Sequence, residues 1–429
     1  MAYPAPSAHR LMRPLLLGAL ICAALYALVR LRSGGVGGGA GVVYGCMMDA
    51  GSTGSRIHVY TFNRAASGRL SLLDELFLEV KPGLSSFKGS PSAGGASLQP
   101  LLDAARAKIP AEKLASTPIY LYATAGLRLL GLRQSTALLE AARDTLQASP
   151  FHFQRENVAL IDGSSEGLFG WITVNFLLHR FDPGATEPTV GIMDMGGAST
   201  QIVFGMRHGQ YAAPADRQQV VMGGKTHDVY VHSYLGFGLM EAGKRVLGHG
   251  GKTHRGLQHP CLPKGHSITV ADKYTTLPAK TGAAVTVVGA DGGFAECDAT
   301  TSALMRKGTR CARPPCAIDG RSMPPVQGTL FYAFSYFFDR TQQMKLPKDT
   351  PIPVSSVAAA AQAACSGDVA ALQQYSGKAA IGQLCLDVCY LNSLLERGYG
   401  FAPDAKLVIA KKIGGVETSW ALGAMLKRM

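Results

Sequence analysis

The sequence feature that most constrains the fold is a loop pattern that occurs twice. The stretch MMDAGSTGSRIHVYTF (47–62) has an apolar run, Asp49, a turn of glycine and hydroxyl residues, and a second apolar strand. GIMDMGGASTQIVFG (191–205) repeats this order around Asp194. Either loop alone would be an ordinary β-hairpin. Because turn N–H groups and hydroxyls bind phosphate oxygens, and a carboxylate can hold a divalent cation, the pair predicts a clamp for a metal–polyphosphate complex.

Composition and charge narrow the class of protein. The chain has 429 residues, 47% of them hydrophobic, which is enough for two packed domains and argues against global disorder. The net charge is +13, but the basic residues are scattered and form no run interleaved with aromatic residues. This pattern favours a small anionic substrate or an acidic membrane surface over nucleic acid.

The N-terminus indicates a secretory-pathway protein. LLLGALICAALYALV (15–29) carries no charge and is flanked by Arg10, Arg13, Arg30 and Arg32. It is short for a membrane span and also fits a cleaved signal peptide. The basic residues after it favour a signal-anchor, with residues 1–32 as cytosolic tail and anchor and the glycine-rich stretch 33–41 as a tether. We therefore expect a single-pass type II membrane protein of the Golgi, secretory-pathway lumen or cell surface; a secreted form is the alternative.

The rest of the chain reads as alternating strands and helices. Strands are expected at 41–50, 56–64, 118–126, 157–163, 189–197 and 200–206, and helices at 101–108, 134–147, 165–181, 328–340 and 384–398. Residues 88–100 read as a loop and 248–325 as an irregular region that contains cysteines. Because the opening pattern restarts, we expect two α/β lobes, made of 42–166 with 405–429, and of 167–404.

Six ordered motifs resemble one family. DAGSTGSR, YATAGLRLL, DGSSEGLFGWITVNFLL, DMGGASTQI, YVHSYLGFGLMEA and SWALGA are similar to the conserved regions of the ecto-apyrases and Golgi nucleoside diphosphatases, the nucleoside triphosphate diphosphohydrolases. This resemblance covers nearly all of 42–427. It implies two actin- and sugar-kinase-like lobes with duplicated ribonuclease H-like cores and a nucleotide cleft between them.

The resemblance also implies roles for individual residues. Glu166 occupies the position of the family's general base. Asp49 and Asp194 occupy the positions of the acids that bind Ca²⁺ or Mg²⁺ through water. Thr124, Ser199 and Gln201 match residues around the attacking water. The positions that match the phosphate loops are Ser52, Thr53, Gly54, Ser55, Arg56, Gly196, Gly197 and Ala198.

Base recognition is less constrained. Tyr399 matches a base-stacking position of cell-surface members, and Tyr336 or Phe337 is a candidate for the opposite face of the base. Core packing is the alternative for all three.

Seven cysteines follow residue 260 and include no zinc-like motif, so we expect disulfides of an oxidising compartment. We predict Cys261–Cys297 and Cys311–Cys316, with Cys365 pairing to Cys389 or, second in preference, to Cys385.

The expected activity is metal-dependent hydrolysis of the terminal phosphate of nucleoside tri- or diphosphates by direct attack of water. Two alternatives stay open. One is a catalytically inactive, membrane-tethered nucleotide-binding module, and the other is an exopolyphosphatase, which shares the lobes but lacks the base pocket.

Overall fold

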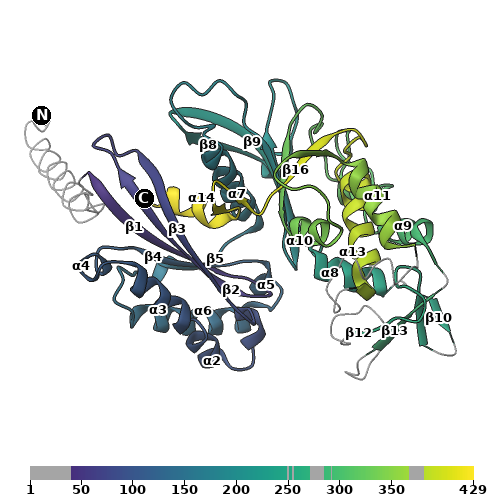
Figure 1. The fold of residues 1–429 in the computed structure, drawn as a ribbon, viewed down its shortest axis with the longest axis horizontal. Helices are drawn as coiled ribbons and strands as arrows, with labels where there is room; N and C mark the ends of the chain where they lie inside the picture. Colours follow the sequence, from purple (N-terminus) through teal and green to yellow (C-terminus); the bar gives the residue numbers. More distant parts are fainter. Residues whose placement is uncertain (1–39, 249–250, 254–255, 271–284, 291, 367–380) are drawn as a thin grey trace, which may run out of the picture. The chain divides into compact units, whose positions relative to one another are not determined.

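The computed structural model describes residues 40–429 apart from 249–250, 254–255, 271–284, 291 and 367–380 (Figure 1). By its contacts the chain forms two compact units, 1–43 with 62–72, and 44–61 with 73–429. The described residues of the first unit are the start of β1 (Gly41–Ala50), the end of β2 (Ser55–Arg64), the start of β3 (Leu70–Val80) and the turn between the last two.

The expected signal-anchor lies outside the described residues, as does most of the glycine-rich tether. Within the ranges that the structure describes, no helix combines the length and the apolar character that a membrane span requires.

A five-stranded sheet carries the first of the two loops. Its strand order is β3-β2-β1-β4-β5, with β4 at Ile119–Ala123 and β5 at Val158–Leu160. β1 runs parallel to β4, and β4 runs parallel to β5. Helices α3 (Gln99–Lys108) and α6 (Leu132–Gln147) bury one apolar stripe each in the core of this sheet. In α6 the stripe is Leu138, Leu139, Ala142 and Leu146, the spacing of one helical face.

A seven-stranded sheet carries the second loop. Its order is β15-β16-β14-β6-β7-β9-β8. The strands are β6 (Gly191–Met195), β7 (Ser199–Gly205), β8 (Arg217–Met222), β9 (Lys225–Leu235), β14 (Phe331–Ser335), β15 (Pro351–Pro353) and β16 (Lys406–Ile409). β6 pairs in parallel with β14, which pairs in parallel with β16, whereas β6–β7 and β7–β9 are antiparallel.

The two sheets share one arrangement around their acidic strands. The order β9-β7-β6-β14-β16 has the same connectivity as β3-β2-β1-β4-β5. In both sheets the strand that carries the aspartate has its sequence neighbour on one side and a parallel strand on the other. The α/β class with a duplicated core is therefore confirmed. β16 belongs to the seven-stranded sheet, although the expected lobe boundary at 404 assigns it to the other lobe.

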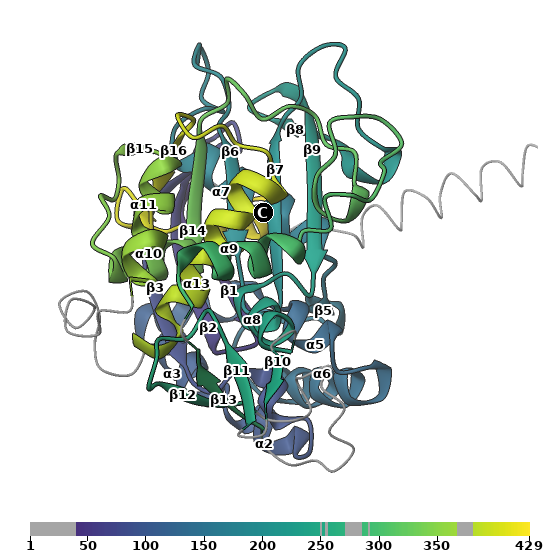
Figure 2. The same ribbon diagram turned by 90° about the vertical axis from the view of Figure 1, so that its right-hand side faces the viewer.

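Helices pack on both faces of the seven-stranded sheet (Figures 1 and 2). Helix α7 (Gly163–Leu177) is apolar on most sides, and its Trp171, Ile172 and Val174 are buried against β6, β7 and β9. On the other face, α8 (Leu239–Leu247), α10 (Tyr336–Gln343) and α11 (Ser355–Ala364) contact the strands. Helix α13 (Ile381–Ser393) packs against these three helices, and α9 (Phe294–Ala303) packs against α13.

The last helix, α14 (Trp420–Leu426), packs against α7 and against the five-stranded sheet. The ring of Trp420 stacks on that of Tyr122 in β4 with centroids 6.0 Å apart, and Arg428 Nε donates to Tyr122 Oη over 2.8 Å. Gly45 in β1 leaves room for Met425, whose sulfur would lie 2.6 Å from a Cβ at that position. Residues 420–428 thus cover one face of β1 and β4.

Three expectations about secondary structure were wrong. Residues 328–340 form strand β14 followed by α10, not one helix. The expected loop at 88–100 contains helix α2 (Pro91–Ala96). The region 248–325, expected to be irregular, contains α9 and a small sheet of order β10-β11-β13-β12. Its strands are Gly251–Thr253, Gly256–His259, Val285–Gly289 and Ser267–Val270.

The disulfides follow the expectation in two cases of three. Cys261–Cys297 and Cys311–Cys316 are present, as predicted. The preferred pairing of Cys365 was wrong, because Cys365 is bonded to Cys385 and Cys389 is a buried free thiol. Cys385 and Cys389 are one helical turn apart on α13, so both lie on the side that faces Cys365.

Candidate active site

The first loop is a tight turn between β1 and β2. Gly51 N–H donates to Gly54 O over 3.1 Å and closes the turn after Asp49. Gly83 packs against it so closely that a Cβ there would lie 2.4 Å from Gly51 O. Gly126 approaches in the same way, because a Cβ at that position would lie 2.8 Å from Ser52 Cα. Because Gly83 and Gly126 have no side chain, their backbone packs directly against the loop, and this packing holds the loop in one conformation.

The second loop connects β6 and β7 and meets the first. Gly196 N–H donates to Ser199 O over 3.0 Å, and the start of α8 donates Met240 N–H to Gly197 O over 3.0 Å. A Cβ at Gly197 would lie 2.8 Å from Ser52 Oγ, so the two loops come into direct proximity. The apposition expected from the sequence is therefore present.

A cavity of about 370 Å³ opens between the two loops. The expected site residues in its wall are Asp49, Ser52, Thr53, Arg56, Thr124, Glu166, Asp194, Gly196, Gly197, Ala198, Ser199 and Tyr336. Gly54, Ser55 and Gln201 are not part of this wall, and neither are the base candidates Phe337 and Tyr399. Phe337 is buried in the core, and Tyr399 is buried with its Oη 3.1 Å from Thr200 Oγ1.

Asp49 and Asp194 fit the ligation of a divalent cation. Asp49 Oδ2 accepts from Arg56 Nη1 over 3.1 Å, whereas Oδ1 is buried and accepts no hydrogen bond from the described residues. Burial raises the pKa of Asp49, although the charge of Arg56 opposes this. Burial also raises the pKa of Asp194 to about 6; hydrogen bonding to Ser335 lowers it, and the charge of Asp49 raises it. Asp194 is thus a desolvated carboxylate that also feels the negative charge of the desolvated Asp49, and a cation would stabilise such a pair.

Glu166 lies in the first turn of α7, which Asp162 caps by accepting Ser165 N–H over 2.6 Å. Its Oε2 accepts from Arg128 Nη2 over 2.8 Å and from Gln201 Nε2 over 3.2 Å. Burial raises the pKa of Glu166 to about 8, because the lowering by Arg128 is outweighed by burial and by the charges of Asp194 and Asp49. A carboxylate with such a pKa can accept a proton near neutral pH.

Gln201 connects the groups around Glu166 from behind the cavity wall. Its Nε2 also lies within donating distance of Ser199 Oγ, at 2.9 Å, and of Ser233 Oγ, at 3.0 Å. Thr124 begins helix α5 (Ala125–Arg128) and lies in the cavity wall. Gln201 and Arg128 thus hold the carboxylate, and the hydroxyls of Thr124 and Ser199 lie in the wall of the same cavity, which suits the positioning of a water molecule.

Two residues in the site were missed by the sequence reasoning. Arg128 holds Glu166, and it lies one helical turn after Thr124 in the quoted motif YATAGLRLL, so an unassigned basic residue inside a recognised motif was an available signal. Ser335 hydrogen-bonds Asp194 and has φ 57, in the left-handed region that non-glycine residues rarely adopt. No local sequence pattern marks that conformation.

A second cavity, of about 830 Å³, adjoins the first. The two share Ser52, Thr53, Gly126, Gly197 and Ala198, so the phosphate-loop candidates form a common wall. The remainder of the second cavity is lined mainly by α8 and the start of α13, together with Ser85, Ser86 and Lys88. A molecule bound by the loops therefore has room to continue into it.

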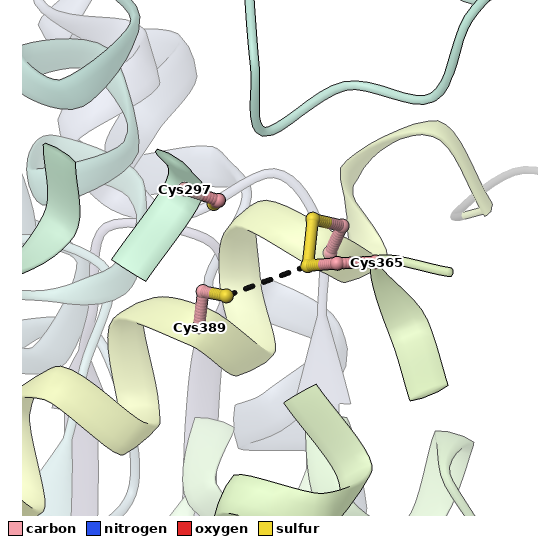
Figure 3. Close-up of side chains that lie close together, drawn as sticks. Cys297, Cys365 and Cys389 are labelled. Atoms are coloured by element: carbon pink, nitrogen blue, oxygen red, sulfur yellow. Dashed lines mark hydrogen bonds between the residues drawn. A yellow bond between two sulfur atoms is a disulfide. The ribbon is translucent and has the colours of Figure 1, made fainter. Parts of the chain in front are cut away.

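A cluster of sulfur atoms lies apart from these cavities. The Sγ atoms of Cys297, Cys365, Cys385 and Cys389 all lie within 4.8 Å of one another. Figure 3 shows the thiol of Cys389 directed at the disulfide of Cys365, 3.4 Å away. Because three of the four sulfurs belong to disulfides, they offer no thiolates, and the cluster does not fit a zinc site.

Comparisons with known proteins agree with this geometry. The family model described as GDA1/CD39 (nucleoside phosphatase) matches residues 40–429. The guanosine-diphosphatase of Schizosaccharomyces pombe is 35% identical over 90% of this chain and 73% of its own length. Nucleoside diphosphate phosphatase ENTPD5 of Homo sapiens is 36% identical over 90% of this chain and 87% of its own.

Solved structures agree in fold. The nucleoside triphosphate hydrolases from Neospora caninum match with a TM-score of 0.63 and 17% identity, over 96% of both chains. A Ppx/GppA family member from Aquifex aeolicus matches with a TM-score of 0.50 and 12% identity, over 90% of this chain and 97% of its own. The expectation of an actin-like fold with a duplicated core is therefore confirmed.

Proposed function

Because the chain belongs to the GDA1/CD39 (nucleoside phosphatase) family, we propose that it hydrolyses the terminal phosphate of nucleoside diphosphates, and of triphosphates where they fit, with Ca²⁺ or Mg²⁺. It is a hydrolase of phosphoanhydride bonds. The names of the two similar enzymes, a guanosine-diphosphatase and a nucleoside diphosphate phosphatase, support diphosphates as substrates. The observation that carries the proposal is the single cavity into which both loops and Glu166 project.

The loops bind the phosphate chain. Their N–H groups, with Ser52 and Thr53, donate to phosphate oxygens, and Arg56 adds positive charge beside Asp49. Asp49 and Asp194 would hold the cation, through water, between the loops. When bound, Ca²⁺ or Mg²⁺ supplies positive charge to phosphate oxygens.

Glu166 accepts the proton of the attacking water. Thr124 and Ser199 position that water from either side, while Gln201 and Arg128 hold the Glu166 carboxylate in place. Because phosphoryl transfer passes through a loose transition state, the positioning of water and phosphate and the neutralisation of charge account for most of the rate.

The nucleoside occupies the second cavity. It shares its wall with the loops and is wide enough, at about 830 Å³, for a sugar and a base. Its size and its partly apolar wall of Leu129, Leu239 and Leu386 favour a nucleotide over a bare polyphosphate chain.

We place the protein in an oxidising compartment, the secretory-pathway lumen or the cell exterior, with the N-terminal segment as its membrane tether. The three disulfides support this location. The two lobes proposed are 42–166 with 405–429, and 167–404; the shared strand order of the two sheets supports a division into two lobes, although β16 pairs in the seven-stranded sheet.

The test is release of phosphate by the purified protein from GDP, UDP, ADP, ATP and inorganic polyphosphate, with Ca²⁺, with Mg²⁺, or with excess chelator. We expect metal-dependent release from at least one diphosphate and its loss in Asp194→Asn. Release from inorganic polyphosphate alone would indicate the exopolyphosphatase. Nucleotide binding with no release under any condition would indicate the inactive module.

A further inference from the structure

The second cavity contains a buried carboxylate that the proposed chemistry does not use. Asp387, on α13, lies in its wall together with Gln383 and Leu386, and its side chain is 10% exposed. The phosphate-loop residues Ser52 and Gly197 lie in the same wall. A nucleotide whose phosphates are held by the loops therefore places its base in a cavity that contains this carboxylate.

Asp387 is fixed in position but not saturated. Its Oδ2 accepts from Arg340 Nε over 2.7 Å, and Arg340 is itself held by Gln343 Oε1, 3.2 Å from Nη1. Oδ1 accepts no hydrogen bond from any residue that the structure describes. With respect to the described part of the chain, Oδ1 can therefore accept from a ligand, while Arg340 holds the group and balances its charge.

Glu241 on α8 is the other acid among the described residues of this wall. Its side chain is 27% exposed and accepts from Lys244 on the same helix over 2.6 Å. A site discriminates between ligands when the wrong ligand leaves a buried polar group of the protein without a hydrogen-bond partner. An exposed group does not discriminate in this way, because water takes the place of the missing partner. Asp387 therefore meets this requirement and Glu241 does not.

We propose that Asp387 determines base specificity by accepting hydrogen bonds from a ring N–H beside a carbonyl, as in guanine, and so selects guanine over adenine. This rests on the proposed function. Guanine offers the carboxylate N1–H and the N2 amine together, whereas hypoxanthine and uracil offer a ring N–H alone. Adenine presents the N1 lone pair at the equivalent position, which a carboxylate repels.

The charge state of Asp387 suits this role at neutral pH. Burial raises the pKa of Asp387 to about 6, and Arg340 counteracts part of that rise. The group is therefore mainly a carboxylate, an acceptor only, at pH 7 and above.

The first experiment compares kcat/KM for GDP and ADP in wild type, Asp387→Asn and Glu241→Gln. Both variants remove one negative charge from the same cavity. We expect the GDP-to-ADP ratio to fall about tenfold or more in Asp387→Asn, the range of one well-placed bidentate contact to a base, and to stay within about twofold in Glu241→Gln. An unchanged ratio in Asp387→Asn, or the larger fall in Glu241→Gln, would overturn the proposal.

The second experiment needs no variant, so misfolding of Asp387→Asn cannot obscure the result. Wild type is assayed with GDP, IDP, ADP and the diphosphate of N1-methylguanosine. We expect the order GDP, IDP, ADP, and at least a tenfold loss for the N1-methyl compound. Equal turnover of GDP and its N1-methyl form refutes this role of Asp387. If wild type releases phosphate from none of them, the proposed function itself fails, which is a different result.

Discussion

At the scale of single residues, the site depends on a glutamate whose charge state is set by its neighbours. Glu166 is buried, and the two nearby aspartates oppose its ionisation. Arg128 is the one group among the causes of its pKa shift that favours the carboxylate. The same arginine holds the carboxylate by a 2.8 Å hydrogen bond, so position and ionisation of the base are controlled together.

Replacement of Glu166 by Gln should remove most turnover and leave the fold intact. The amide has nearly the same shape and still accepts from Arg128, but it cannot take a proton from water. We expect kcat to fall at least about 10²-fold, the contribution typical of a general base. Phosphate release and the melting temperature are measured together. A well-folded variant with near-normal turnover would exclude Glu166 as the base.

Replacement of Arg128 by Gln should move the pH dependence of kcat/KM. Activity rises with pH as Glu166 loses its proton, so the rising limb follows the pKa of Glu166, about 8 in the protein without ligands. Arg128 lowers that pKa; without it the pKa rises, the limb moves to higher pH, and activity at pH 7 falls.

The matched control for Arg128→Gln is Arg133→Gln, which removes the same charge from an exposed position at the start of α6. We expect no shift of the limb in this variant. If the rising limb of the pH profile lay at the same pH in Arg128→Gln and in wild type, a group other than Arg128 would control the pKa of Glu166.

At the scale of elements, the two central helices α7 and α14 pack through a glycine. A Cβ at Gly423 would lie 2.0 Å from the carbonyl oxygen of Phe169, and Gly423 N–H donates to Thr173 Oγ1 over 2.8 Å. Gly170, also on α7, is different, because a Cβ there would make an ordinary contact of 3.5 Å with Phe334. Close packing of the two helices therefore requires glycine at position 423 but not at position 170.

Gly423→Ala should therefore destabilise the protein, although alanine is favoured over glycine in a helix by about 1 kcal/mol. The new methyl group meets backbone and forces the helices apart, which costs about 1–3 kcal/mol in typical overpacked cores. Gly170→Ala, the control, should be neutral or stabilising. Thermal unfolding of both variants decides this: a melting temperature of Gly423→Ala at or above that of wild type would contradict the packing argument.

Sequence reasoning succeeded for elements where a local pattern and the fold agree. The Asp49 and Asp194 loops were found because glycine, hydroxyl and acid recur after buried strands. It failed for GTLFYAFSYFFDR, where aromatic residues fit either structure and pairing with β6 and β16 makes the first part a strand. It also chose the wrong partner for Cys365, because Cys385 and Cys389 share a helix face and spacing cannot separate them.

At the scale of the whole molecule, both sheets contribute one acid to the predicted metal site. Ligand binding should therefore stabilise the protein as a unit. With Ca²⁺ and a non-hydrolysable nucleoside diphosphate at a hundred times its Kd, linkage predicts about 2.7 kcal/mol of stabilisation. Thermal unfolding with both ligands, with each alone and with neither measures it.

Asp194→Asn should lose the stabilisation by the combined ligands, whereas Asp103→Asn, an exposed acid on α3, should keep it. If Asp194→Asn, or wild type in excess chelator, showed the full stabilisation by the combined ligands, the cation would not be part of the binding site.

The packing of α14 has a consequence for how the chain acquires its structure during synthesis. Proteins emerge from the ribosome N-terminus first, and domains generally fold in that order. Here the strands β1 and β4 emerge before every strand of the seven-stranded sheet, but the side chains that cover one of their faces, such as Trp420 and Met425, are made after all of those strands. We expect the first sheet to keep an apolar face exposed, accessible to chaperones, until α14 has emerged.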